Sequence, residues 1–568
     1  MADDRLSQLP IPILHHILCS LSQEAAVRTC ILSKQWRHIG STRPNLDFSE
    51  DWLSITPEKF VSVVDRIIQE YRDQNLSIHK LHLEISSPDS RRIISLLDKW
   101  IPMIAALNVK VFKLDCFSET RDYYDLPSAV FLAESLEELH LCQCRVSPVE
   151  SVQFKCLRKL TLIWVKVDGG TFETITSGCP LLRSLVIDTC WGLRNVRLSE
   201  ATLPGLKHFE LDNFKRIKGC SIEINVLNIE TVRIEGPWIW SNRQSTFLFS
   251  RLTSLRLYYV ILSSESFDLL SFRCPILESL TLHNCSGFEE FHLASNSVKW
   301  LRISTSEILL KGARICAPNI LNFTFIAHIS QALHTFCFTT TTSKEWCSQV
   351  VLSSSHKDYP NFRVDSWFLG LRRLLKALSG SRISLFLQMD NSSEDLPWSA
   401  VRSGEPPVVE PPVVVRNLNF ATCKCRTVSW YMGFTNALFR VCQPSYVWGG
   451  SLVSEPGRKY RFTEFQLNIY RLANGKVRTP PYFLRHNLEQ VFVEALDEQP
   501  WHLMQWSNEM ELQKWVQDGK IGLRLKWRFQ NKLLAMDPDL KRTVVEDLDR
   551  FVRRKDNYRS VGKAWRRG

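Results

Sequence analysis

The feature that most constrains the fold is a short apolar pattern that recurs through the middle of the chain. Its unit reads apolar-x-x-apolar-x-apolar, often with a cysteine three residues later, and the clearest copies lie at residues 136–144, 182–190 and 277–285. Weaker copies centre on Leu81, Phe112, Leu160, Phe209, Val232, Leu255, Leu301 and Phe323. From Leu139 onward, neighbouring copies lie 21, 25, 24, 23, 23, 25, 21 and 22 residues apart. A chain with this regularity is expected to stack one small unit on the next.

The period falls in the range of roughly 20–29 residues that is typical of leucine-rich repeats. In a leucine-x-leucine strand, both apolar side chains point to one face, so each unit buries them only against its neighbours. We therefore predict an α/β solenoid with parallel strands on its concave face and helices or loops outside. The cysteine of each unit should turn inward, where a weakly polar thiol is well suited to burial.

A different pattern occupies residues 6–36. Leu9, Ile13, Leu14, Ile17 and Leu18 recur at three- and four-residue spacing, which predicts one helix, and two shorter helical segments follow at once. A unit below roughly 40–50 residues cannot bury so much apolar surface alone. We expect another chain or domain to cover part of it.

This segment resembles the plant F-box, and the family's sequence words occur here in the family's order. They are Asp4-Arg5-Leu6-Ser7, Leu9-Pro10, Ile13-Leu14, Ile17-Leu18, Ala26-Val27-Arg28-Thr29, Leu32-Ser33-Lys34-Gln35-Trp36-Arg37, Pro44, Leu46, Asp47 and Phe48. The sequence departs from the family at Ile11-Pro12, where an acidic residue usually follows Leu-Pro. A three-helix cap on a larger domain is the alternative interpretation.

The resemblance implies docking onto a Skp-type adaptor and, through it, onto a cullin. The residues expected to contact the adaptor are Leu9, Pro10, Ile13, Leu14, Ile17, Val27 and Trp36. The irregular repeats, with Cys-Pro before Leu-x-x-Leu at Cys179 and again in a similar word at Cys274, resemble plant F-box/leucine-rich-repeat proteins as far as about residue 325. The expected domains are an F-box (1–50), a helical connector (51–75), leucine-rich repeats (76–330), irregular C-terminal repeats or an α/β cap (331–535), and a basic terminal helix and tail (536–568).

The C-terminal third is less regular. Five segments alternate well enough to predict strands: Ile383–Leu387, Val415–Phe420, Phe462–Tyr470, Leu488–Val493 and Gly522–Phe529. The last segment, from Asp537, has helical spacing and ends in basic residues. A solvated tail is the simpler interpretation, and a nuclear-targeting or nucleic-acid-binding patch is the alternative.

Composition places the chain among intracellular globular proteins, in the nucleus, the cytoplasm or both. The N-terminus lacks the basic and apolar regions of a signal peptide, and no window is apolar enough for a membrane helix. The 17 cysteines are then expected to be reduced thiols. The net charge of +12 over 568 residues permits acidic partners without requiring nucleic acid.

Catalytic motifs are missing from the sequence. It contains no phosphate-binding glycine loop, no nucleophile elbow and no zinc-protease signature. Cys142 and Cys144 lack a second ligand pair at zinc spacing. We therefore predict a chain that is not an enzyme, has no metal site and needs no cofactor.

These observations favour a substrate-recognition adaptor of a ubiquitin ligase, which holds an unidentified protein substrate on its repeats. The outward strand positions expected to contact the substrate are His208, Arg233, Arg256, Tyr258, His283, Trp300 and Arg302. The three arginines among them suit an acidic segment or a small anion. The alternative is a leucine-rich-repeat scaffold or a nucleic-acid-binding protein without ligase function.

Overall fold

The structure, a computed structural model, forms two compact units. The first comprises residues 1–354 and 373–383, and the second comprises residues 355–372 and 384–568. The described residues are 8–21, 23–49, 57–85, 91–117, 123–213, 219–240, 249–262, 274–305, 312–328, 335–340, 345–353, 364–389, 411–422, 428–448, 466, 469–471, 487–495 and 521–528.

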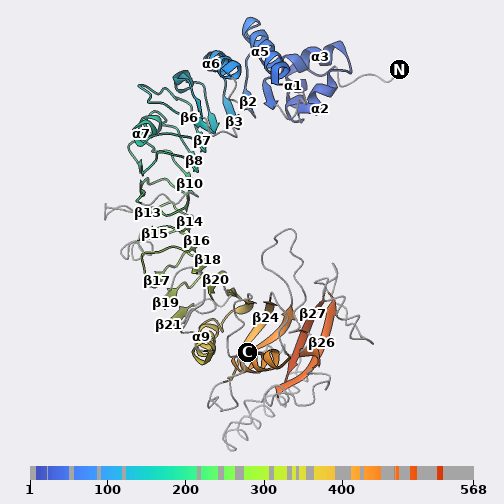
Figure 1. The fold of residues 1–568 in the computed structure, drawn as a ribbon, viewed down its shortest axis with the longest axis vertical. Helices are drawn as coiled ribbons and strands as arrows, with labels where there is room; N and C mark the ends of the chain where they lie inside the picture. The colour runs from blue at the N-terminus through green and yellow to red at the C-terminus, as the bar shows by residue number, and fades with distance from the viewer. Residues whose placement is uncertain are drawn as a thin grey trace, which may run out of the picture. The chain divides into compact units, whose positions relative to one another are not determined.

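Parallel strands run through the first unit in chain order and form its main sheet (Figure 1). Each strand pairs with the next in register, so that Leu139, Leu160, Leu185 and Phe209 form one continuous buried row. The predicted repeat is confirmed. Its strands are β1 (Asn45–Ser49), β2 (Lys80–Ile85), β3 (Val111–Cys116), β5 (Glu138–Cys142), β7 (Lys159–Ile163), β8 (Ser184–Asp188), β10 (His208–Asp212), β12 (Thr231–Glu235), β14 (Ser254–Tyr258), β16 (Ser279–His283), β18 (Trp300–Thr305), β20 (Asn322–His328) and β22 (Cys347–Ser353).

The chain turns inward after many of these strands by means of one residue in the left-handed region. Thr189 follows β8 with φ 48°, and Asn284 follows β16 with φ 49°. The next residue in each case is a buried cysteine, whose thiol donates to a carbonyl oxygen of an earlier repeat: Cys190 to Leu162 and Cys285 to Leu257, both at 3.4 Å. This geometry explains why the sequence pattern carries a cysteine three residues after the strand leucine.

Gly287 completes one of these turns and allows a sharp prediction. Its φ is +96°, and a Cβ there would collide with the carbonyl oxygen of Leu262. We expect Gly287→Val to destabilise the repeats by about 2 kcal/mol, because side chains other than glycine are strained in this region. Thermal unfolding would measure the loss, with Gly169→Val as control, since a Cβ at Gly169 meets nothing within 4 Å. A melting temperature equal to that of the wild type would contradict the turn geometry.

The outer side of the first unit begins with helices and continues with short strands. The helices are α5 (Pro57–Asp73), α6 (Arg91–Ala106), the 3-10 helix η1 (Ser128–Leu132) and α7 (Gly169–Ser177). Short parallel sheets join β4 (Tyr124–Asp125) and β6 (Cys144–Arg145), then β9 (Asn195–Ser199), β11 (Ser221–Asn225), β13 (Ile239–Trp240) and β15 (Ile261–Leu262), then β17 (Glu290–Ala294), β19 (Gly312–Cys316) and β21 (Thr335–Thr339).

The prediction of helices or loops outside is therefore incomplete. In the later repeats, apolar residues alternate a second time, as at Val196 and Leu198 or Ile222 and Ile224, and each pair is buried. A period of two favours a strand over a helix. The second strand of these repeats could have been found in the sequence by the same rule as the first.

The second unit contains a mixed sheet. Strands β23 (Arg382–Met389), β24 (Val413–Thr422) and β25 (Cys442–Trp448) are parallel, whereas β27 (Ile521–Trp527) runs antiparallel to both β25 and β26 (Leu488–Ala495). Helix α10 (Val428–Val441) connects β24 with β25, and α9 (Val364–Ala377) precedes β23. Both α9 and β23 cross the boundary between the units in the chain, because residues 373–383 belong to the first unit. Four of the five predicted C-terminal strands are confirmed. The strand predicted at Phe462–Tyr470 is wrong where it is described, since residues 466, 469 and 470 are helical. The segment from Asp537 onward lies outside the described residues.

Candidate functional site

The N-terminal helices α1 (Ile11–Cys19), α2 (Gln23–Thr29) and α3 (Lys34–Ser41) enclose a small core. Its buried members are Leu14, Leu18, Ala26, Trp36 and Ile39, with Leu9 and Ile17 packed against them. Helix α3 begins at a serine N-cap, because the Ser33 hydroxyl accepts a hydrogen bond from the Trp36 backbone at 3.2 Å. This cap sets the position from which Trp36 enters the core.

The seven residues expected to contact an adaptor therefore occupy different environments. Pro10 and Ile13 are exposed, and Leu9 and Ile17 are half-buried. Leu14 is 0% and Trp36 only 6% exposed, so both fill the core of this domain, and their contact with an adaptor stays a prediction. The side chain of Val27 lies outside the described residues. Helical periodicity finds apolar residues, but it does not separate those that fill a core from those that face a partner.

Other apolar side chains of this domain remain open to solvent. Ile31 is 81% and Leu32 is 70% exposed in the turn between α2 and α3. In α1, Ile11 and Ile13 are also exposed. Single exposed apolar residues are common, but several on a domain this small are typical of a protein-binding surface. We call Ile11, Ile13, Ile31 and Leu32 the exposed F-box set.

The F-box region is joined to the repeats by a strand rather than by a free linker. Strand β1 pairs with β2 over five residues, Asn45 to Ser49 against Lys80 to Glu84. The hydroxyl of Tyr71 in α5 also donates to the Arg43 carbonyl at 2.6 Å. The segment predicted as the end of the F-box is thus also the first strand of the main sheet.

Charged side chains strengthen this junction on the face of the sheet that points away from the core, which we call the open face. His82 contacts Asp47 through Nδ1 at 2.8 Å and Asp115 through Nε2 at 2.9 Å. Burial by itself disfavours the charged imidazole, but the hydrogen bonds to Asp115 and Asp47 outweigh it and raise the pKa of His82 to about 9.

Asp115 is the centre of this network. It also contacts His140 at 2.9 Å and Lys113 at 2.7 Å. Its burial opposes ionisation, yet these hydrogen bonds hold its pKa well below the usual range. The sequence analysis missed the network, although all its members occupy strand positions of successive repeats. An alignment of the outward positions would have placed them side by side.

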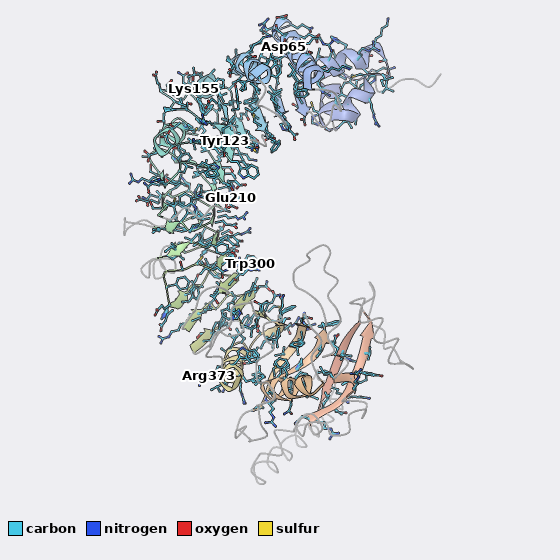
Figure 2. All side chains as sticks on the ribbon, viewed as in Figure 1. Asp65, Tyr123, Lys155, Glu210, Trp300 and Arg373 are labelled. Atoms are coloured by element: carbon cyan, nitrogen blue, oxygen red, sulfur yellow. The ribbon has the colours of Figure 1, made fainter. Side chains whose placement is uncertain are left out.

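Farther along the open face lie the seven residues expected to contact a substrate. All of them are exposed or half-exposed at outward positions of β10 to β18, and Figure 2 labels Glu210 and Trp300 on the same side of the stacked strands. We describe them in two groups along the strand order. The first group contains His208 and Arg233, the second contains Arg256, Tyr258, His283, Trp300 and Arg302. The groups adjoin, because Arg233 and Arg256 are register partners on β12 and β14 and Arg256 also lines the depression described next.

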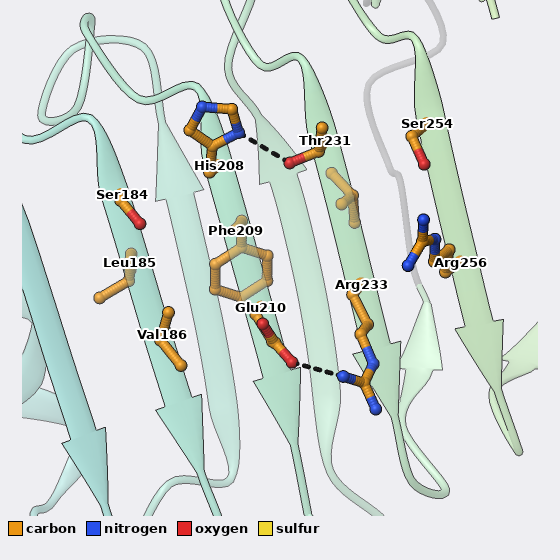
Figure 3. A pocket seen from close by; sticks show the side chains of 11 residues that line it. Ser184, Leu185, Val186, His208, Phe209, Glu210, Thr231, Arg233, Ser254 and Arg256 are labelled. Atoms are coloured by element: carbon orange, nitrogen blue, oxygen red, sulfur yellow. Dashed lines mark hydrogen bonds and ion pairs between the residues drawn. The ribbon is translucent and has the colours of Figure 1, made fainter. Parts of the chain in front are cut away.

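The first group lines a depression of about 270 Å³ across β8, β10, β12 and β14 (Figure 3). His208 Nδ1 lies 2.9 Å from the Thr231 hydroxyl. Arg233 donates to Glu210 at 2.7 Å and to Glu235 at 2.9 Å. Its guanidinium is therefore neutralised within the chain.

Carboxylates stand at the ends of the strands beside this depression. Asp188, Asp212 and Glu235 are register partners on β8, β10 and β12. Burial, followed by repulsion from Glu235 and Asp188, raises the pKa of Asp212 to about 6 despite the attraction of Arg233. We call Asp188, Asp212 and Glu235 the acidic row. Glu210 and Glu235 are outward positions in the sequence, so both signs of charge are expected on this surface, but the alignment of Glu235 with Asp188 and Asp212 depends on strand register.

The second group combines aromatic rings with arginines. His283 lies 5.7 Å from Tyr258 and 5.3 Å from Tyr259, measured between ring centroids. Trp300 is 42% exposed, and the Lys299 ammonium lies 5.9 Å from its ring. Arg256 and Arg302 are exposed and form no ion pair with any described residue. These two guanidiniums are available to an anionic partner.

The part of the chain that the structure describes contains neither a candidate metal-binding cluster nor a membrane-spanning helix. Its histidines, cysteines and acidic residues form no group of three or more suited to a metal ion. None of its helices has the length and apolar character needed to cross a bilayer.

Comparison with known proteins agrees with this architecture. The F-box domain family matches residues 6–47. The family described as "FBD-associated F-box protein At5g56370, LRR repeats" matches residues 97–218 and 205–319. The chain therefore carries a segment similar to the F-box domain at residues 6–47 and leucine-rich repeats similar to those of F-box proteins over residues 97–319.

Two relatives from Arabidopsis thaliana illustrate the likeness. The chain is 30% identical to "F-box/LRR-repeat protein At3g03360" over 211 residues, which are 35% of this chain and 41% of that protein. It is 29% identical to "F-box/LRR-repeat protein 25" over 202 residues, which are 35% of this chain and 73% of that protein. The chain thus spans less than half the length of several relatives that it matches, At3g03360 among them.

Proposed function

We propose that this chain is the substrate-recognition subunit of a Skp–cullin–F-box ubiquitin ligase. The F-box would bind a Skp-type adaptor, and through it a cullin, while the open face of the repeats holds a target protein. The chain would contribute proximity and orientation rather than chemistry, by raising the effective concentration of substrate lysines near the ubiquitin-loaded enzyme. This role would place it inside the cell, in the nucleus or the cytoplasm.

The observation that carries the proposal is the exposed F-box set on a domain whose described core is formed by other residues. Leu14, Leu18 and Trp36 fill the interior, so Ile31 and Leu32 are not needed there. Apolar residues that gain burial only in a complex are typical of interface centres. The sheet pairing of β1 with β2 supports the second half of the proposal, because it would hold a bound substrate at a defined orientation to the adaptor.

The decisive experiment is adaptor binding by the double variant Ile31→Asp/Leu32→Asp. We expect at least a 100-fold loss of affinity for a purified Skp-type adaptor, because two central apolar contacts are each typically worth about 2 kcal/mol. Isothermal titration calorimetry would measure it.

The matched control is Leu181→Asp/Leu227→Asp, which changes two exposed leucines of the repeats. It should bind the adaptor as the wild type does. Equal affinities for the two double variants would contradict an F-box interface at Ile31 and Leu32.

A further inference from the structure

The open face contains three arginines, on β12, β14 and β18, but they differ in their surroundings. Arg233 is held between Glu210 and Glu235 and lies 5.4 Å from the Tyr258 ring. Figure 3 shows this arginine directed at Glu210, whereas Arg256 on the next strand has no such contact. Arg302, two strands farther along, is likewise without an ion pair among the described residues. Two of the three cations are therefore unneutralised.

Strand register fixes the relation between these two cations. Arg256 pairs with Thr281, and Thr281 pairs with Arg302. Their backbones are thus roughly 10 Å apart, which is twice the spacing between strands. The Thr281 side chain stands between them and offers a hydroxyl donor. A guanidinium binds carboxylate and phosphate groups through paired hydrogen bonds, so this arrangement suits two anionic groups or one highly charged group.

Aromatic side chains border the arginine pair on both sides. Tyr258 lies two residues after Arg256, and Trp300 lies two residues before Arg302. An exposed tryptophan beside a cation is a frequent anchor in protein interfaces. The surroundings of the pair are therefore those of a peptide-binding surface rather than of a small-ion site.

The acidic row restricts what can bind next to this pair. Asp188, Asp212 and Glu235 lie at outward positions of β8, β10 and β12, and with Glu210 they place four carboxylates around Arg233, which is the register partner of Arg256. A long polyanion that followed the strands would meet these carboxylates within two or three repeats. Charge complementarity thus favours a short acidic segment over a nucleic acid.

We propose that Arg256 and Arg302 bind a short acidic segment of the protein substrate, with Trp300 and Tyr258 contacting its apolar neighbours. The inference rests on the proposed function only in taking the open face as the substrate surface. In an extended polyproline-type segment, side chains three residues apart lie on one side at roughly 9 Å, which matches the separation of the two arginines. The acidic groups are carboxylates or phosphorylated side chains, which share the same chemistry.

The test uses the purified full-length chain and fluorescein-labelled peptides. The probe is four repeats of Glu-Ala-Pro, and the neutral comparison is four repeats of Gln-Ala-Pro. A third peptide replaces glutamate by phosphoserine. We expect the acidic peptides to bind and Arg256→Glu/Arg302→Glu to weaken that binding roughly tenfold or more, since two charge-assisted contacts are reversed. Stronger binding of the phosphoserine peptide would identify phosphate as the source of the charge.

Arg314→Glu is the control for reversing one charge elsewhere on the repeats, because Arg314 is an exposed arginine of β19, outside the main sheet. It should leave peptide affinity within twofold. Equal binding of the neutral peptide, or undiminished binding by the double variant, would overturn the proposal. The proposal would also be overturned if a single-stranded RNA bound more tightly than the acidic peptides and the same double variant abolished that RNA binding. Adaptor affinity of the Arg256→Glu/Arg302→Glu variant is measured in parallel. If the peptide results contradict this inference while adaptor affinity equals that of the wild type, the proposed function still stands.

Discussion

Truncation of Trp36 to alanine should unfold the F-box while the repeats stay intact. The indole is 6% exposed and packs with Leu14, Leu18, Ala26 and Ile39. Removing a buried tryptophan typically costs about 3–5 kcal/mol, because the contacts are lost and a cavity remains. A core of this size has little stability in reserve. Hydrogen exchange measured by mass spectrometry should show α1 and α3 losing protection, while β12 to β18 exchange as in the wild type.

Ile13→Ala is the control for this prediction. Ile13 lies one residue before the buried Leu14, but its side chain is 46% exposed. We expect protection in α1 to change by less than about 1 kcal/mol, as is usual for surface positions. If Trp36→Ala left the exchange of α3 unchanged, the assignment of Trp36 to the core would be wrong.

The difference between buried core residues and exposed residues affects how a loss of adaptor binding is interpreted. A variant of Trp36 would lose the adaptor because the whole binding domain opens, not because one contact is missing. Ile31 and Leu32 can be changed without such an effect, since neither belongs to the core cluster. Binding experiments on these two residues therefore report on the interface itself.

The repeats could be predicted from the sequence because their signal is local and recurs. Leu139, Leu185 and Leu280 each begin the same strand pattern, and each is buried at the same place in the stack. A single strand of five residues would be ambiguous, but the regular spacing removes the ambiguity. The buried cysteines followed from the same alignment of units.

Contacts between distant residues were harder to predict. Asp47 and Asp115 are far apart in the chain, and only the pairing of β2 with β1 on one side and with β3 on the other brings both to His82. Whether Arg233 or Arg256 is neutralised depends on Glu210, which belongs to a different repeat. At Phe462–Tyr470, apolar alternation predicted a strand where described residues are helical, because a few alternating residues fit both periods.

Asp115→Asn should be among the most destabilising single substitutions in the first unit. The Asp115 carboxylate is buried and accepts from His82, His140 and Lys113. Its loss would leave the largely buried His82, and the more exposed His140 and Lys113, without their shared anion, at a cost of about 3–5 kcal/mol. Urea unfolding followed by circular dichroism would measure the loss. Asp125→Asn is the control, because the Asp125–Arg145 pair is largely exposed and should contribute under about 1 kcal/mol. Equal midpoints for the two variants would contradict a stabilising network.

The same network gives stability a defined dependence on pH. The pKa of His82 is about 9 in the folded chain and near 6.5 when unfolded, so the imidazolium stabilises the fold fully below about pH 6.5. That contribution is lost as pH rises through 9, and it amounts to about 3 kcal/mol. Asp115 acts in the opposite direction, since its lowered pKa makes its contribution complete above about pH 4. The urea midpoint of the wild type should therefore fall between pH 6 and pH 10 by more than that of His82→Gln, which cannot titrate here. If the urea midpoints of the two proteins fell equally between pH 6 and pH 10, His82 would not be held as an imidazolium between Asp47 and Asp115.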